Sequence, residues 1–228
     1  MVSTAMSLRA VKPQHETRTR ILDAAEELFM QHGFEGTSMR LLTAKAGVNL
    51  AAVNYHFGSK DALVEAVFRR RLDPMNAARL AALDKLEAAE RVPQPEAVIR
   101  AFIAPGLRLM EDAKGGGRNF VRLLGRTYSE PNKTVRALIG QMYAPTMQRY
   151  KAALERAIPQ MPREELVWRM HFMFGTLAYT LAATDTVQLI AGCKPEDRYD
   201  AALLEERLTA FLAAGLNAPL KNVIRKAA

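Results

Sequence analysis

Apolar side chains in the first third of the chain recur at helical spacing. From residue 21 onward they stand at i, i+4, i+7 and i+8, and so share one helix face: Ile21, Ala25, Leu28 and Phe29. Acidic side chains occupy the other faces. This pattern predicts an amphipathic helix that starts near Glu16 and ends at Gly33, because glycine is suited to a C-terminal cap.

Short polar side chains that can cap helices divide the next stretch. The predicted helices and their N-caps are residues 39–46 after Thr37 or Ser38, residues 50–57 after Asn49, and residues 60–71 after Ser59. Gly47 and Val48 make a tight turn between the first two of these helices. Short helices joined by a glycine turn are typical of a helix-turn-helix, which we place from Thr37 to Phe57.

Longer helices, separated by proline and glycine, are predicted for the rest of the chain. They are expected at residues 75–90, 95–112, 118–129, 132–158, 163–189 and 198–217. Neither strand-like alternation nor an internal repeat occurs. The sequence therefore predicts an all-α fold with an irregular, disordered tail over residues 1–15, a small helical domain over 16–72 and a larger helical domain over 73–228.

The composition permits a polyanionic partner without locating its binding site. The 228 residues carry a formal net charge of +8, whereas residues 1–72, with 10 Lys and Arg against 7 Asp and Glu, carry only +3. The single cysteine, Cys193, cannot form an internal disulfide, which favours a reducing compartment. Residues 1–15 lack the apolar core of a signal peptide, and the longest apolar stretch, 170–183, is too short to span a bilayer. We expect a cytoplasmic protein without a membrane partner.

Helical spacing gives the third predicted helix one buried and one outward flank. The apolar residues expected inside the helix-turn-helix are Leu42, Ala46, Val48, Val53 and Phe57. The outward flank carries Leu50, Ala51, Asn54 and Tyr55. A helix of this kind fits the major groove, where Asn can hydrogen-bond adenine and small apolar groups can contact the thymine methyl. Taken alone, these residues also suit ordinary caps and a solvated helix face.

Two strings favour DNA binding over that alternative. Ala46-Gly47-Val48-Asn49 and Tyr55-His56-Phe57-Gly58-Ser59-Lys60, within residues 16–71, closely resemble the TetR family of repressors. The resemblance implies an N-terminal DNA-binding domain followed by a ligand-binding and dimerisation domain. It also implies two partners, double-stranded operator DNA and a second copy of the chain.

The predicted DNA contacts combine the outward flank with the positions that the resemblance implies. They are Thr37, Ser38, Asn49, Leu50, Ala51, Asn54, Tyr55, His56 and Lys60. Among these, Thr37, Ser38, Tyr55, His56 and Lys60 are expected at the phosphate backbone. The family more often has Tyr or Phe at position 54, so Asn54 is expected to read a base instead.

Two features of the C-terminal part point to association and to a ligand. Residues 163–182 are amphipathic at first and then apolar on nearly all sides, which fits a helix that faces both its own core and a partner subunit. A central core helix is the alternative. The candidate lining of a pocket for an apolar effector is Phe102, Met110, Phe120, Arg122, Leu123, Met142, His171 and Phe172. Arg122 could anchor an anionic head group or form a structural ion pair with Glu111 or Glu155, and His171 could equally be a core histidine.

Three strings suggest a subgroup within the family. Residues 50–57, residues 122–125 and residues 168–173 look like those of the PsrA-type regulators, which respond to long-chain fatty acids. The resemblance implies a repressor that such a ligand releases from DNA. The alternatives are a helical adaptor, or an enzyme with a site assembled in the C-terminal bundle. We predict no enzymatic activity, no cofactor and no metal, since the four histidines lie far apart and no nucleotide-binding or nucleophile motif occurs.

Overall fold

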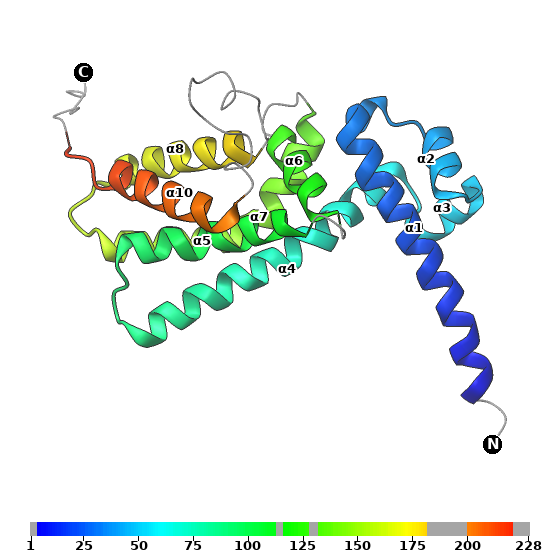
Figure 1. Cartoon of the computed structure of the whole chain (residues 1–228), viewed down its shortest axis with the longest axis horizontal. Helices are drawn as coiled ribbons and strands as arrows, with labels where there is room; N and C mark the ends of the chain where they lie inside the picture. Colours follow the sequence, from blue (N-terminus) through cyan, green and yellow to red (C-terminus); the bar gives the residue numbers. More distant parts are fainter. Residues whose placement is uncertain (1–3, 113–115, 128–131, 182–199, 221–228) are drawn as a thin grey trace.

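The computed structural model describes residues 4–112, 116–127, 132–181 and 200–220, with residues 4–13 and 126 described by their backbone alone. These ranges contain helices and no strand, which confirms the predicted all-α class (Figure 1). The helices are α1 (Thr4–Gly36), α2 (Met39–Ala46), α3 (Leu50–Phe57), α4 (Lys60–Ala89), α5 (Pro95–Glu111), α6 (Gly117–Thr127), α7 (Lys133–Ala157), α8 (Arg163–Leu181) and α10 (Ala201–Leu216). None of the described helices is long and apolar enough to cross a membrane.

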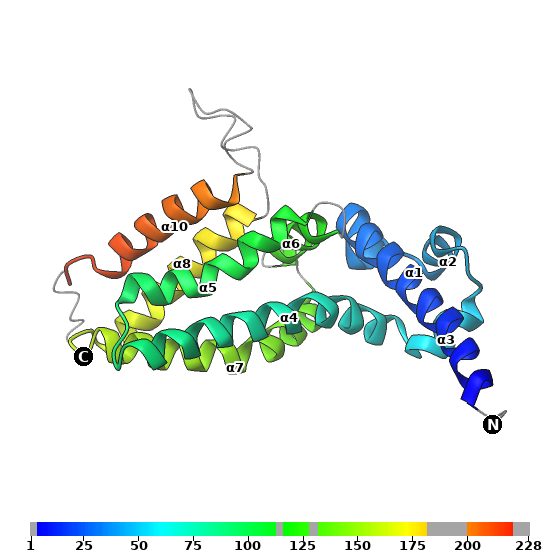
Figure 2. The same cartoon turned by 60° about the horizontal axis from the view of Figure 1, so that its bottom comes forward.

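Two groups of helices follow one another along the longest axis of the molecule. Helices α1 to α3 and the start of α4 lie together at one end, and α5, α6, α7, α8 and α10 gather around the rest of α4 (Figures 1 and 2). A first buried cluster joins α1 to α4 with parts of α6 and α7, and a second joins α4, α5, α7, α8 and α10. Both clusters include residues of α4, so this helix connects the two groups.

The predicted helix caps are confirmed. Ser38, Asn49 and Ser59 each accept a hydrogen bond from the backbone N–H three residues later, at 3.2, 2.8 and 3.1 Å. Gly47 closes α2 in the left-handed region, with φ 63° and ψ 41°. Gly33 has φ 73° and interrupts the helical backbone of α1 where the sequence predicted its end.

Helix α1 begins earlier than predicted. The sequence analysis placed an irregular segment over residues 1–15, whereas helix is described from Thr4 onward. Alanine, leucine, methionine and arginine make up much of residues 4–12. These are strong helix formers, and they extend the helix without any apolar periodicity of their own.

Helix α4 also differs from the prediction. The sequence analysis ended one helix at Arg71 and started another at Met75, but α4 continues through Pro74. Proline removes one backbone hydrogen bond within a helix. Leu72 and Met75, on either side of Pro74, are both buried, and their packing holds the two turns in line despite that loss.

The ends of several predicted segments lie outside the described residues. This applies to residues 128–129 and 182–189, to 198–199, and to Cys193.

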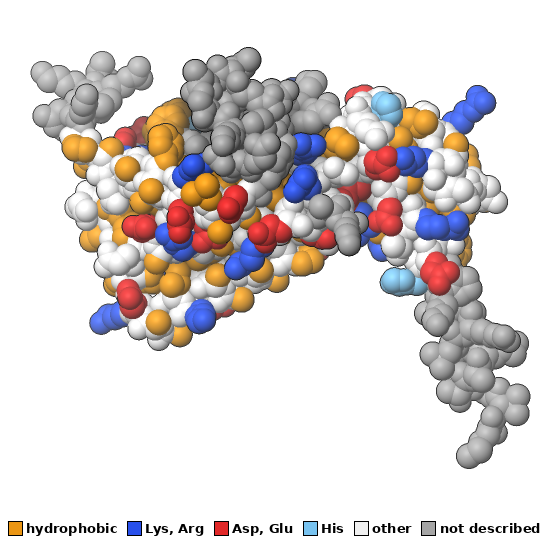
Figure 3. Space-filling model, viewed as in Figure 1, with side chains coloured by type: hydrophobic (Ala, Val, Ile, Leu, Met, Phe, Trp, Pro, Cys, Tyr) orange, Lys and Arg blue, Asp and Glu red, His pale blue; other side chains and the backbone are white. Residues whose placement is uncertain are grey.

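On the face shown in Figure 3, basic and acidic side chains are interspersed, and the positive charge does not gather into one patch there.

Candidate DNA-binding surface and ligand cavity

Helix α3 has the two flanks that its spacing predicted. Val53 is buried against α1 and α2, whereas Leu50 and Tyr55 have exposed fractions of 51% and 72%. Ala51 and Asn54 are exposed as well. The polar and small side chains of α3 are therefore available to a partner on the outer side of the molecule.

The turn before α3 fixes the direction of this flank. Leu42 and Ala46 are buried on α2, and Val48 in the turn packs partly into the same cluster. Gly47 has φ 63°, a conformation that a residue with a Cβ adopts only under strain. Asn49 uses its side-chain oxygen to cap α3, so its carboxamide oxygen is already engaged.

The predicted phosphate contacts fall into two groups. Ser38 is exposed and His56 and Lys60 are half-buried, so all three keep contact with solvent. Thr37 differs, because its side chain is 2% exposed and its hydroxyl donates to the Gly33 carbonyl oxygen at 2.8 Å. The Thr37 side chain is thus part of the packing between α1 and α2.

Arg40 is a candidate contact that the sequence analysis missed. It lies on α2 two residues after the Ser38 cap, its side chain is exposed, and it forms no ion pair with the described residues. Lys45 on the same helix is instead paired with Glu27. The sequence held a signal for it, since Arg40 lies in the first turn after a predicted cap, where a basic side chain can reach a phosphate bound at the start of the helix.

A cavity of about 880 Å³ opens between α4, α5, α6, α7 and α8. Its volume lies in the range of small-molecule sites. The residues that line it are mainly apolar. We call its buried lining residues the inner wall and its exposed lining residues the mouth. The inner wall includes Met75, Arg79, Phe102, Gly106, Val121, Leu124, Tyr143 and Leu181, and the mouth includes Arg136, Gly140, His171, Gly175 and Tyr179.

Two of the eight predicted ligand-binding residues, Phe102 and His171, line this cavity. The other six are not among the residues that line it: Met110, Phe120, Arg122, Leu123, Met142 and Phe172. On α6 the cavity is lined by Val121 and Leu124, while Phe120 packs its ring 5.8 Å from that of Phe68. Neighbouring apolar residues on one helix face different cores, which a one-dimensional pattern does not separate.

Phe172 and Arg122, two of these six residues, keep contact with solvent. Phe172 is 61% exposed on α8. Arg122 is half-buried and does not line the cavity. Glu155 is one of the two acidic residues that the sequence analysis offered as ion-pair partners for Arg122. Its described ion pairs are with Lys151 and Arg163.

Arg79 is the charged residue of the inner wall, and the sequence analysis overlooked it. Its side chain is 2% exposed. The Nε donates to the Phe102 carbonyl oxygen at 2.8 Å, and Nη1 donates to the Asn76 side-chain oxygen at 3.2 Å. The guanidinium lies over the Phe102 ring, 4.1 Å from its centroid. Met75, Arg79 and Leu83 stand at i, i+4 and i+8, and that spacing could have placed Arg79 on the buried face.

Tyr150 supports the same helix from α7. Its hydroxyl donates to the Arg79 carbonyl oxygen at 2.7 Å, and its ring lies edge-on to Phe102 with centroids 5.1 Å apart. Burial raises the pKa of Tyr150 well above its ordinary value. The phenol therefore stays neutral and acts as a fixed donor beside the cavity.

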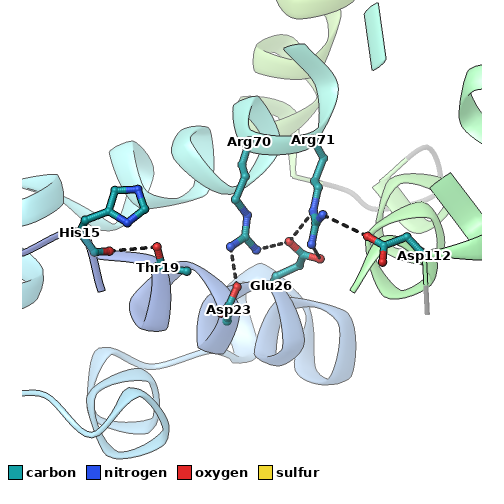
Figure 4. Close-up of polar contacts among 7 residues, drawn as sticks. All are labelled: His15, Thr19, Asp23, Glu26, Arg70, Arg71 and Asp112. Carbon is teal, nitrogen blue, oxygen red and sulfur yellow. Dashed lines mark hydrogen bonds and ion pairs between the residues drawn. The ribbon is translucent and has the colours of Figure 1, made fainter. Parts of the chain in front are cut away.

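Charged side chains connect the two groups of helices (Figure 4). Glu26 on α1 is 3% exposed and binds both Arg70 and Arg71 of α4. Arg70 also pairs with Asp23 at 2.6 Å, and Arg71 reaches Asp112, directly after α5, at 3.7 Å. This network, which we call the Glu26 network, ties α1 to α4 and to the end of the cavity-lining helix α5.

Large apolar side chains remain exposed on α8 and α10. On α8 they are Val167, Trp168, Phe172 and Tyr179, and on α10 the exposed one is Phe211, with exposed fractions from 50% to 67%. Trp168 and Phe172 lie against each other with ring centroids 6.0 Å apart. Contiguous apolar surface of this kind is typical of an interface.

Comparison with known proteins places the chain in one family. Residues 21–67 match the model of the bacterial regulatory proteins of the tetR family, and residues 100–215 match the tetracyclin repressor-like C-terminal domain. The regulator RutR of Escherichia coli K12 is 34% identical over 128 residues, which are 50% of this chain and 59% of RutR. UidR of the same strain is 41% identical over 51 residues, which are 22% of this chain and 26% of UidR. The chain therefore aligns with only part of the length of these relatives.

Solved structures share the fold at low sequence identity. FadR from Bacillus subtilis, determined in complex with stearoyl-CoA, has a TM-score of 0.65 and 15% identity, covering 86% of this chain and 98% of its own. PfmR from Thermus thermophilus, a TetR family regulator, has a TM-score of 0.58 and 21% identity, covering 89% and 100%. The two matched family models, together spanning more than half of the chain, show that it belongs to the TetR family.

Proposed function

We propose that this regulator is a homodimeric cytoplasmic repressor, which binds a pseudo-palindromic operator and leaves it when an apolar effector fills the cavity. The observation that carries the proposal is the outward flank of α3, where Asn54 and Tyr55 are exposed while Val53 is buried. Residues 16–72 form the DNA-binding domain in this proposal, and residues 73–228 bind the effector and the partner subunit.

The outward flank of α3 enters the major groove in this proposal. Asn54 reads an adenine through its carboxamide, and Leu50 or Ala51 contacts a thymine methyl. Tyr55 on that flank contacts the phosphates along the groove edge in this proposal, and so do Ser38, His56 and Lys60. The backbone N–H groups at the start of α2 and α4 add a positive dipole end on that side.

Removing two phosphate-binding side chains tests DNA binding. We expect Tyr55→Ala combined with Lys60→Ala to weaken binding to every duplex sequence, because phosphate contacts carry no sequence information. The slope of log affinity against log salt should become shallower by about one for each phosphate that the variant no longer neutralises. Fluorescence anisotropy on specific and random duplexes at several salt concentrations measures both. A helical adaptor would show no DNA affinity for these changes to reduce.

Asn54→Ala is the contrasting variant on the same helix. We expect it to cost about 1–3 kcal/mol on the specific operator and to relax the preference at a single base pair. Binding to random duplexes should stay as in the unchanged protein, because Asn54 reads a base. An equal loss on all sequences would contradict base reading by Asn54.

Homodimer formation is proposed from the apolar faces of α8 and α10. A two-fold dimer presents two recognition helices to two half-sites, about 34–36 Å apart or a multiple of that spacing. The exposed side chains of Trp168, Phe172 and Phe211 supply the aromatic anchors that dominate such interfaces.

A charge placed on this face should separate the subunits. We expect Phe172→Glu to raise the dimer dissociation constant at least about tenfold, because a carboxylate would be buried against apolar side chains. Light scattering coupled to size exclusion measures the mass over a concentration series. Val92→Glu is the matched control, since Val92 is 45% exposed on the turn between α4 and α5. A chain that is monomeric without any change would contradict the homodimer.

An apolar effector is proposed from the cavity wall and from the similar proteins. Buried aliphatic and aromatic side chains make up most of the inner wall. FadR from Bacillus subtilis was solved with stearoyl-CoA, and the strings at residues 50–57, 122–125 and 168–173 resemble the PsrA-type regulators. A long-chain fatty acid or its CoA thioester is the ligand class that fits these features.

Effector and operator are proposed to compete through helix α4. Met75 and Arg79 on α4 line the cavity, and Leu63 and Val67 on the same helix pack against the DNA-binding helices. A ligand shifts the equilibrium only by its difference in affinity for the two states. A ligand that binds more tightly to the state in which α4 is tilted favours that state. In it the two α3 helices of the dimer no longer match the distance between the operator half-sites.

A further inference from the structure

We infer that Arg79 binds the carboxylate of the effector, so that the regulator senses a free acid with an apolar body and not its CoA thioester. The inference rests on the proposed function, because it takes the cavity between α4 and α8 as the effector site. It goes further by naming the head group, the residue that binds it and the orientation of the ligand.

Arg79 is a buried cation without a charged partner in the described part of the chain. Its hydrogen-bond acceptors are the Phe102 carbonyl oxygen and the Asn76 side-chain oxygen, both neutral. The ring faces of Phe102 and Tyr143, at 4.1 and 5.5 Å, offset part of the cost of burial without neutralising the charge. Burying an arginine without a counter-ion is unfavourable, and an anion that enters the cavity relieves this.

The Nη2 group of Arg79 lies next to Gly106, and both Arg79 and Gly106 line the cavity. No described residue accepts a hydrogen bond from Nη2, whereas Nε and Nη1 are both engaged. Gly106 lies beside it, and a Cβ at that position would be 3.4 Å from Nη2. Glycine is a poor helix former, but here its missing side chain lets the guanidinium pack close to α5, with the Nη2 donors of Arg79 still available.

The depth of Arg79 distinguishes a free acid from a CoA thioester. Arg79 and Phe102 are buried on the inner wall, whereas Arg136, His171 and Tyr179 at the mouth are exposed. A carboxylate is small enough to reach Nη2 with the apolar body behind it, filling the cavity toward the mouth. The nucleotide of a CoA thioester is too large and too polar for the inner wall, and its phosphates would have to stay at the mouth beside Arg136.

Three ligands with the same chain test this assignment on the purified full-length protein. The probes are tetradecanoate, tetradecanol and tetradecanoyl-CoA, with affinities measured by isothermal titration calorimetry. We expect the acid to bind at least about tenfold more tightly than the alcohol, because a hydrogen bond to a charged group adds that much. We also expect the acid to bind more tightly than the thioester. Equal affinity for acid and alcohol, or binding of the thioester alone, would overturn the assignment.

Two arginine variants locate the contact. Arg79→Met keeps the apolar volume and should lower the affinity for the acid about 10- to 100-fold while leaving that for the alcohol unchanged. Arg136→Met removes one positive charge at the mouth and should leave the affinity for the acid within about threefold of that of the unchanged protein. The opposite pattern would place the head group at the mouth and overturn the inference.

A third variant covers the case that Arg79→Met does not fold. Gly106→Ala keeps Arg79 and places a methyl group about 3.4 Å from Nη2, where it competes with a carboxylate for the donors of that group, so the acid should lose much of its advantage over the alcohol. An unchanged advantage would overturn the inference. Failure of the proposed function looks different, since none of the three ligands would then alter operator affinity, even if the acid still bound at Arg79.

Discussion

Phe68→Ala should lower the free energy of unfolding by about 3–5 kcal/mol, which is the range for removing a fully buried phenylalanine. Phe68 on α4 is 0% exposed. Its ring lies 5.8 Å from Phe34 of α1 and 5.8 Å from Phe120 of α6. The substitution leaves a space at the point where the DNA-binding helices, α4 and the cavity-lining helix α6 meet, and three separate helices cannot all move in to fill it.

Urea unfolding without DNA, at fixed protein concentration, measures this loss. Tyr55→Ala is the matched control, because it also removes an aromatic ring but from a side chain that is 72% exposed. We expect the control to change the free energy of unfolding by less than about 0.5 kcal/mol. A loss below about 1 kcal/mol for Phe68→Ala would mean that the junction is not closely packed around this ring.

The parts of the structure that were predictable from the sequence depend on local interactions. The caps at Ser38, Asn49 and Ser59 involve a backbone N–H three residues away, so residue type and position are enough to find them. The two flanks of α3 follow from helical periodicity alone, as the burial of Val53 and the exposure of Asn54 show. The predicted burial pattern of α3 is confirmed for this reason, and its contacts to DNA stay a prediction.

The parts that the sequence did not predict depend on contacts between distant segments. The continuation of α4 through Pro74 is decided by the packing of Leu72 and Met75, which local propensity does not include. Which apolar residue of α6 faces the cavity depends on the rotation of that helix between two cores, so Val121 was passed over in favour of Phe120. Arg79 was missed because a single charge among alanines and leucines looks like a solvated position until its neighbours are known.

Glu26 is a further case of this kind, since its partners lie 44 and 45 residues away. On a predicted surface helix it was assigned to the polar face, yet it is 3% exposed and holds two arginines of α4. Its role in the protein therefore has to be argued from the fold, and it makes a second prediction.

Glu26→Gln should lower the free energy of unfolding by roughly 2–3 kcal/mol, because removing one member of a buried ion pair leaves its partners without that charge. We expect a loss below the largest values for buried ion pairs because Arg70 and Arg71 keep contact with solvent. Their side chains are 22% and 17% exposed. Asp23 and Asp112 also remain as partners. Urea unfolding at fixed protein concentration measures the change.

Glu27→Gln is the control at the adjacent position. It removes the same charge, but Glu27 is 40% exposed and pairs with Lys45 at the surface. We expect a loss of less than about 1 kcal/mol there, reduced further by salt. Equal losses for the two variants would show that burial of Glu26 does not strengthen its pairs.

The Glu26 network should also affect how strongly ligand binding changes the affinity for the operator. It connects α1, part of the proposed DNA-binding domain, to α4 and to Asp112, directly after α5, and α4 and α5 both line the cavity. If α1 and α4 move as one body only while this network holds, Glu26→Gln reduces the ratio of operator affinities measured without and with tetradecanoate, whereas Glu27→Gln leaves it unchanged. A ratio that stays the same in the Glu26 variant, despite its lower stability, would assign the network to folding alone and leave the apolar junction at Phe68 as the link between cavity and DNA.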